Sequence, residues 1–189
     1  MTDWFGRFPA EVAARQDAYL VDSQLRGLSV KVRAGAALDV KMYHGSPGIF
    51  EVSGRAFCRT ESWQKWSFPL ASFSQDSGGP AIWRPIRKRR RIIRFQLAGD
   101  RVVVAVPGTA TEPRCAVELT EIYVGEEAFW SLGFEATGPA ELLLGVLQDS
   151  AALMFAQEPP GQVDLSMDCC QSYAQWLSRH RAPRMMTRS

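Results

Sequence analysis

Hydrophobic and polar residues alternate with a period of two along most of the chain from Trp4 to about Glu135. In the segment LSVKVR, residues 28–33, valines alternate with Lys31 and Arg33. This alternation is typical of β-strands that have one apolar and one polar face, and turn residues such as AGAA, HGSPG and AGD separate several of the runs. The candidate strands are residues 4–8, 17–22, 28–33, 37–43, 49–58, 61–68, 90–97, 101–106, 114–124 and 128–136.

The apolar spacing becomes helical after Gly138 and Pro139. One apolar stripe lies within residues 142–154 and a second within residues 165–177. These stripes predict two amphipathic helices that close the domain. Because no long helical segment separates the candidate strands, we expect an antiparallel sheet or barrel instead of a parallel α/β core.

The chain of 189 residues is long enough for one domain with a substantial core. We predict a single α+β domain, mainly β, over residues 1–181, with barrel strands in 1–137 and closing helices in 138–181. Residues 182–189 are expected to form a tail. The segment ASFSQDSGGPAIWRP, residues 71–85, is rich in Ser, Gly and Pro and is expected to be a long loop.

Charged residues are nearly balanced, with a formal net charge of +2, but the cations are unevenly placed. The segment IRKRRRIIR, residues 86–94, contains six of them and predicts a locally positive surface or channel. The near balance of the whole chain argues against a protein whose main role is to coat nucleic acid.

The cysteines predict a reduced, cytoplasmic protein, because none of the four lies in a C-x-x-C pair or at a zinc-site spacing. The segment MTDWFGRFPAEV resembles neither a signal peptide nor a transit peptide. No apolar run approaches the length needed to span a bilayer, so no membrane association is expected.

Polar strand faces carry several charges that could meet in one place. Lys31, Arg33 and Lys41 lie on two neighbouring candidate strands, and Glu118 and Glu135 lie on a pair that could form a hairpin. Two interpretations are open. These faces are solvated, with ordinary cross-strand ion pairs, or they line the interior of a polar barrel, where cations and carboxylates would bind an anion and a hard cation such as Mg²⁺.

Several segments, in this order, resemble the CYTH domains, also called triphosphate tunnel metalloenzymes. The resemblance covers roughly residues 3–137, and no single segment in it is specific. The segments that carry it are DAYLVD, LSVKVR, LDVKM, ESWQKWSF, VELTEI and LGFEA.

The family begins with an E-x-E-x-K signature on its first strand, and the corresponding stretch here is taken to be DWFGRF. This alignment offers Asp3 for the first Glu, Phe5 for the second and Arg7 for the Lys. Phe5 cannot bind a metal, and Arg7 presents a guanidinium fork where the family has a compact ammonium group. The chain therefore departs from the family where the family builds its metal site.

The resemblance implies an antiparallel eight-stranded tunnel barrel whose cations and glutamates point inward. It implies metal-dependent triphosphatase activity, that is, hydrolysis of a phosphoanhydride, with Mg²⁺ or Mn²⁺ as cofactor and Glu118 and Glu135 as catalytic residues. The expected metal ligands are Glu118, Glu135 and Asp3. The expected phosphate-binding residues are Arg7, Lys31, Arg33, Lys41 and Arg94.

Three functions follow from different interpretations of these residues: hydrolysis of a triphosphate, binding of a phosphorylated small molecule or polyphosphate without turnover, and a regulatory β-domain. In the third, the basic run 87–94 docks an acidic partner or nucleic acid. We favour binding of a phosphorylated ligand in a CYTH-like tunnel, with hydrolysis as an accompanying activity, and rank nucleic acid last among the partners. Neither the substrate nor the oligomeric state can be inferred from these patterns.

Overall fold

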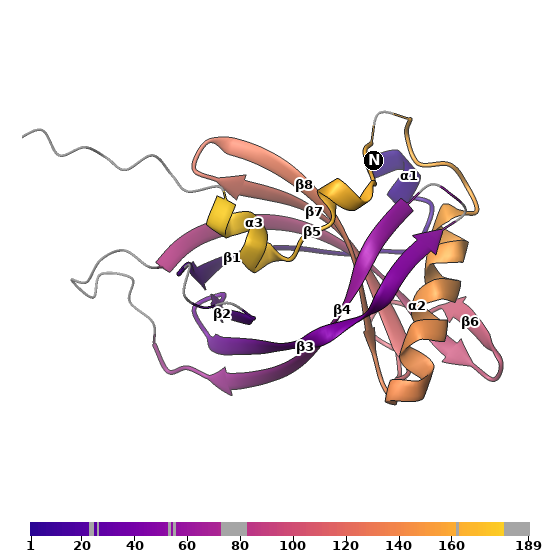
Figure 1. Ribbon diagram of the computed structural model, residues 1–189, viewed down its shortest axis with the longest axis horizontal. Coiled ribbons are helices and arrows are strands. Elements are labelled where there is room, and N and C mark those ends of the chain that lie inside the picture. Colours follow the sequence, from indigo (N-terminus) through magenta and orange to yellow (C-terminus); the bar gives the residue numbers. More distant parts are fainter. Residues whose placement is uncertain are drawn as a thin grey trace, which may run out of the picture.

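The protein is a curled antiparallel sheet with three α-helices and one 3₁₀ turn, shown as a computed structural model in Figure 1. The structure describes residues 1–22, 25, 27–52, 54, 56–72, 83–161 and 163–179. The strands are β1 (Glu11–Leu20), β2 (Leu28–Arg33), β3 (Ala37–Val52), β4 (Ala56–Pro69), β5 (Trp83–Ala98), β6 (Arg101–Val104), β7 (Arg114–Val124) and β8 (Glu127–Thr137). The helices are α1 (Thr2–Phe5), α2 (Ala140–Phe155), the 3₁₀ turn η1 (Met167–Cys169) and α3 (Tyr173–Arg179).

The strands follow the spatial order β4-β3-β2-β1-β5-β7-β8, with β6 paired to β5. All pairings are antiparallel, and the sheet curls into a half-barrel. The prediction of a mainly β, antiparallel fold followed by helices is therefore confirmed. The helix predicted within residues 142–154 is α2, but the one predicted within residues 165–177 is wrong as a single helix, because residues 170–172 separate η1 from α3. Residues 73–82 of the predicted long loop, and the predicted tail 182–189, lie outside the described residues.

The predicted strand over residues 4–8 is wrong, because Thr2–Phe5 forms helix α1. Trp4 and Phe5 are both buried in one core, which a strand could not achieve, since neighbouring side chains of a strand point to opposite faces. The first strand, β1, begins instead at Glu11.

The predicted strand over residues 49–58 is also wrong, because a turn divides it between β3 and β4. Val52 pairs with Ala56 across this turn, and Gly54 has a φ of +65°, which glycine adopts without strain. The two long strands make one hairpin, and its register shifts between Tyr43 and Gly48. These irregularities bend the hairpin. Its half near Lys41 faces the inner side of the sheet, whereas Phe50, Val52 and Ala56 of the other half are buried in the core with α2.

The outer face of the sheet is covered at one end by helix α2 (Figure 1). Val117 and Leu119 of β7 pack there with Val146 and Met154 of α2. Helix α1 joins this core through Trp4, whose indole donates a hydrogen bond to the carbonyl of Gln157 at 3.0 Å.

The opposite, inner face of the sheet meets helix α3. Leu177 of α3 is fully buried against Ile86 of β5 and Ile122 of β7, with Trp176 and Tyr173 packed around it. Helix α3 therefore closes one end of the inner face with apolar and aromatic side chains.

Side chains, not backbone hydrogen bonds, join the two edges of the described sheet. No pairing between β4 and β8 is present among the described residues, so the backbone does not form the closed tunnel that was predicted. Phe50 of β3 instead contacts Phe134 of β8 with 6.0 Å between ring centroids. On the inner face, Lys41 of β3 reaches Glu135 of β8 at 2.8 Å, which spans the mouth of the half-barrel.

The C-terminal segment is tied to the sheet by a disulfide between Cys58 of β4 and Cys170, next to η1. The expectation of four reduced cysteines is therefore wrong for this pair. No signal in the spacing revealed it, since the two residues are 112 positions apart and are brought together only by the path of the chain after α2. Cys115 and Cys169 remain as free thiols, the first buried and the second exposed.

Candidate functional site

Charged side chains from seven strands meet on the inner face of the half-barrel. We call them the inner-face cluster. Its cations are Arg15, Lys31, Arg33, Lys41, Lys65, Lys88, Arg90 and Arg94, and its carboxylates are Glu11, Asp17, Asp39, Glu118 and Glu135. The cluster therefore contains more basic than acidic side chains.

Asp17 of β1 lies at the centre of the cluster and is fully buried. Its carboxylate is 3.1 Å from the Nε of Arg15, 3.6 Å from the Nζ of Lys31 and 3.9 Å from the Nζ of Lys88. The register explains this convergence, because Arg15 pairs with Lys88 across β1 and β5, and Lys31 pairs with Tyr19 across β1 and β2. One buried carboxylate is thus shared among three cations.

Lys88 is the most enclosed cation of the cluster, with 5% of the residue exposed. Its Nζ donates a hydrogen bond to the hydroxyl of Tyr19 at 2.6 Å and lies 3.7 Å from the ring centroid of Tyr173. Burial, together with the nearby charge of Lys31, lowers the pKa of Lys88 to about 7. Burial likewise lowers the pKa of Lys31 to about 8, although Asp17 opposes this.

A second buried carboxylate, Asp39 of β3, lies toward the β4 edge of the cluster. Arg33, Lys65 and Lys31 approach it at 3.2, 3.7 and 3.9 Å, and the hydroxyl of Ser67 donates to it. Burial acts to raise its pKa, but the hydrogen bond from Ser67 and these cations lower the pKa below its ordinary value. Asp39 therefore stays ionised and fixes the three cations in place.

Arg90 of β5 holds Glu118 of β7 through two hydrogen bonds, one from Nε at 2.7 Å and one from Nη2. Thr120 donates a further hydrogen bond to the same carboxylate at 2.5 Å. Burial acts to raise the pKa of Glu118, but the hydrogen bond and charge of Arg90 lower it to about 2. Glu118 is therefore held by a bidentate, charge-assisted pair, the stronger kind of side-chain hydrogen bonding.

Replacing Glu118 with Gln should lower the free energy of unfolding by about 2–3 kcal/mol at pH 7, because the lowered pKa contributes stability above the unfolded value of about 4.5. That contribution is lost as pH falls through about 2 in the folded state, so the difference between variant and wild type should shrink toward pH 2. Urea unfolding across this pH range measures the effect. The same substitution at Glu126, an exposed residue of the β7–β8 turn, is the control and should change little.

Four of the five predicted phosphate-binding residues lie in the inner-face cluster: Lys31, Arg33, Lys41 and Arg94, the last bound to Glu11 at 2.5 Å. Arg7 does not. It follows helix α1, and its Nε donates to the carbonyl of Trp4 at 3.0 Å. The alignment of DWFGRF with a first strand therefore fails, because this segment is helical and carries Asp3 with it.

The residues that were not predicted are mainly those of β1 and the Lys88–Arg90 part of β5. Arg15 lies outside the strand predicted over residues 17–22, and Asp17 lies inside it but was given no role in the site. Lys88 and Arg90 belong to a run of consecutive cations, in which alternation does not show which side chains share a face. The signal that could have identified them is the pairing of β1 with β5 along ten residues, which fixes which members of the run share a face with Asp17.

The expected metal ligands do not form a metal site in this arrangement. Glu118 and Glu135 are both on the inner face, as predicted, but Arg90 binds the first and Lys41 the second. Asp3 lies in helix α1. Within the described part of the chain, no group of three or more His, Cys, Asp or Glu side chains is placed to hold a metal ion. Both carboxylates are therefore occupied by basic side chains and do not lie open to a metal ion in this arrangement.

A cavity of about 650 Å³ lies next to the cluster, between α3 and the β2–β3–β4 side of the sheet. Tyr43 and Trp63 line it as an edge-to-face pair with centroids 5.4 Å apart, and Arg59 and Leu177 lie on its walls. Tyr19 borders both this cavity and Lys88. Its volume falls within the range of small-molecule sites, and its lining combines aromatic rings with polar and charged side chains such as Ser29, Glu61 and Gln175.

Comparisons with protein-family models, with curated proteins and with solved structures found no match to the chain. No helix among the described residues is both long and apolar enough to cross a bilayer.

Proposed function

We propose that the chain binds a phosphorylated small molecule, with a triphosphate or polyphosphate group held by the inner-face cluster. The single observation that supports this most is the excess of cations on one enclosed polar face. A face whose only role was to be solvated would not bury Asp17 and Lys88 or bring strands β3 and β8 together through an ion pair. The proposed class is a divergent CYTH-like domain.

The cluster favours an anion with several charges. The carboxylates Asp17 and Asp39 each serve three cations, so each cation retains unused hydrogen-bonding capacity. Phosphate oxygens can satisfy that capacity, and charge-assisted hydrogen bonds of this kind are stronger than neutral ones. Lys65, Arg33 and Lys41, whose side chains are 44%, 39% and 29% exposed, would meet the ligand first.

The cavity beside the cluster would take the organic part of the ligand. Its aromatic walls at Tyr43 and Trp63 provide apolar contact, and Tyr19 connects it to the cations. The phosphates would then lie toward Lys31 and Lys41, with the organic group between α3 and the hairpin.

Metal-dependent hydrolysis is not part of this proposal. Glu118 and Glu135 are each neutralised by a basic side chain, and the described residues offer no third carboxylate beside them. Binding without turnover is therefore the expected behaviour, with the chain acting as a sensor or carrier of a phosphorylated compound.

Titration of the protein with tripolyphosphate in a calorimeter tests the proposal. We expect saturable binding that Arg33→Gln and Lys41→Gln each weaken about tenfold, because each removes one charge-assisted contact. Arg101→Gln, which removes an equal charge from a side chain that is 86% exposed on β6, is the matched control and should not change the affinity. Absence of binding, or equal weakening by Arg101→Gln, would contradict the proposal.

Phosphate release should be assayed in the same samples with and without Mg²⁺ or Mn²⁺. We expect none above the rate without protein. Steady metal-dependent release that is abolished by Glu118→Gln would instead show that the inner face is a catalytic site, and would overturn the assignment as a binding module.

A further inference from the structure

The outer face of β5 carries a row of arginines that the inner-face cluster does not use. The alternation of the strand divides the basic run, so that Lys88, Arg90 and Arg94 point inward while Arg87, Arg89 and Arg91 point outward. We call these three residues the outer arginine row. Successive side chains on one face of a strand are roughly 6.8 Å apart, so the row extends over more than one charged unit of a polymer.

The row has no anionic partner among the described residues. Arg87 and Arg89 are exposed, and none of the three forms an ion pair within the described part of the chain. Glu121 of β7 pairs in register with Arg89, but its carboxylate accepts a hydrogen bond from the hydroxyl of Tyr123 at 2.9 Å. The three arginines of the outer arginine row outnumber this one neighbouring carboxylate, so the surface around the row is positively charged.

Aromatic rings flank the row on the neighbouring strands. The guanidinium of Arg87 lies 5.6 Å from the ring centroid of Tyr123 on β7. Trp130 of β8 lies in register with Glu121, one strand further along, and is 50% exposed with no ring contact to another described residue. Helix α2 packs on this face from Leu119, the register partner of Arg91, onward, so Arg91 is partly covered while Arg87, Arg89 and Trp130 remain exposed.

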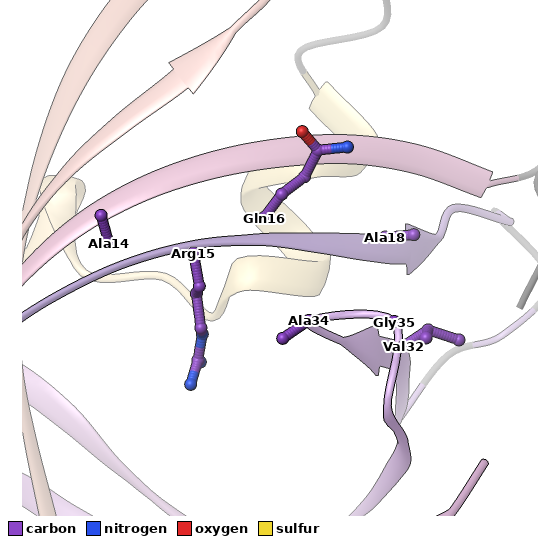
Figure 2. A pocket seen from close by; sticks show the side chains of 7 residues that line it. All are labelled: Ala14, Arg15, Gln16, Ala18, Val32, Ala34 and Gly35. Carbon is purple, nitrogen blue, oxygen red and sulfur yellow. The ribbon is translucent and has the colours of Figure 1, made fainter. Parts of the chain in front are cut away.

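A hollow of about 450 Å³ adjoins the row on its other side. It is lined by residues of β1, β2 and the β2–β3 turn, including Ala14, Gln16, Val32 and Ala34. In Figure 2 the side chain of Arg15 points away from those of Ala14 and Gln16. The hollow exists because β2 pairs with β1 only from Asp17 onward. Ala14 and Gln16 face Arg89 and Arg87 across the β1–β5 ladder, so the hollow and the row form one surface.

We propose that this surface, formed by the outer arginine row with Tyr123, Trp130 and the adjoining hollow, binds single-stranded nucleic acid. Arginines would contact successive phosphates while exposed rings stack on bases, which is the combination that sequence-tolerant single-strand binding uses. An acidic protein segment would satisfy the charges but would give no role to Trp130 or to a hollow of nucleotide size. The site is separate from the inner-face cluster and does not depend on the function proposed for it.

The first test measures, by fluorescence anisotropy, the affinity of the full chain for a 20-nucleotide oligodeoxythymidine over a range of salt concentrations. Each phosphate contact contributes about 0.7 to the slope of log affinity against log salt for single strands. The triple variant Arg87→Gln, Arg89→Gln, Arg91→Gln should therefore reduce that slope by about 2 and weaken binding at low salt. The single variant Arg89→Gln should reduce it by about 0.7, whereas Arg101→Gln, an exposed arginine on β6, should leave it unchanged.

The second test separates nucleic acid from other polyanions. An abasic oligomer of the same length keeps the phosphates but removes the bases. Wild-type protein should bind it about tenfold more weakly than oligodeoxythymidine, and Trp130→Ala should bind the two equally. If poly-glutamate binds as tightly as the oligomer, or if Trp130→Ala still discriminates between them, the nucleic-acid assignment is overturned. An unchanged slope in the triple variant would overturn the location.

Discussion

Replacing both Cys58 and Cys170 with Ser is expected to lower the free energy of unfolding by about 2–4 kcal/mol. The disulfide closes a loop of 112 residues, so its removal gives the unfolded chain much more conformational freedom. It also removes the covalent link between β4 and the segment that carries η1, which is otherwise joined to β4 by a hydrogen bond from the amide of Phe57 to the carbonyl of Leu165. Urea unfolding of the variant and of wild type under oxidising conditions measures the difference.

Cys169→Ser is the matched control for this experiment, because it is the same substitution at the neighbouring position but affects an exposed free thiol. It should change stability little. Titration of thiols in the unfolded protein should find two free and two bonded in wild type, and four free if the bond between Cys58 and Cys170 does not form. A double serine variant as stable as wild type would show that the bond between Cys58 and Cys170 does not support the fold.

Replacing Lys88 with Met should remove part of the pH dependence of stability. Burial lowers the pKa of Lys88 in the folded state to about 7, against 10.5 when the side chain is free. Wild-type protein therefore takes up fewer protons at this site when folded than when unfolded, and its stability should rise with pH between these values. The rise due to Lys88 should reach about 3 kcal/mol between pH 7 and pH 9.5, and it should be absent in Lys88→Met.

Unfolding by urea at both pH values measures this rise as a difference between wild type and Lys88→Met. Met keeps the length and apolar stem of the side chain, so packing against Tyr19 and Tyr173 is largely preserved. Arg101→Met is the control, because it makes the same kind of change at an exposed position of β6 outside the inner-face cluster. A difference between wild type and Lys88→Met that stays constant with pH would mean that Lys88 remains protonated in its tyrosine enclosure.

Much of the fold could be predicted because local alternation reports which residues share a face. Strand β2 agrees with its predicted bounds, and β7 and β8 agree closely. The failures occurred where adjacent residues serve the same core. Trp4 and Phe5 form a helical turn whose pattern over so few residues cannot be told from a strand. Gly54 makes a turn inside residues 49–58, where apolar residues recur on both sides of it and suggested one strand.

The charged character of the candidate site could be predicted from the sequence, but several of the residues that form it could not. Lys31, Arg33 and Lys41 each stand alone between apolar neighbours, so alternation assigns them to one face. In the run RKRRR every position is charged, and only the ladder between β1 and β5 decides that Lys88 and Arg90 face Asp17 while Arg89 faces away. The pairing partner is a long-range property, and a single sequence does not encode it in any local pattern.

The seam between the β3–β4 hairpin and β8 has a consequence for how the molecule opens. A seam held by Phe50 against Phe134 and by Lys41 against Glu135 can part without breaking any interstrand amide hydrogen bond. The irregular segment between Tyr43 and Gly48 separates the two contacts along β3, because Lys41 lies before it and Phe50 after it. Phe50 is buried in the core under α2, so separation of Lys41 from Glu135 alone would widen the side opening of the inner face while the far end of the hairpin stays fixed.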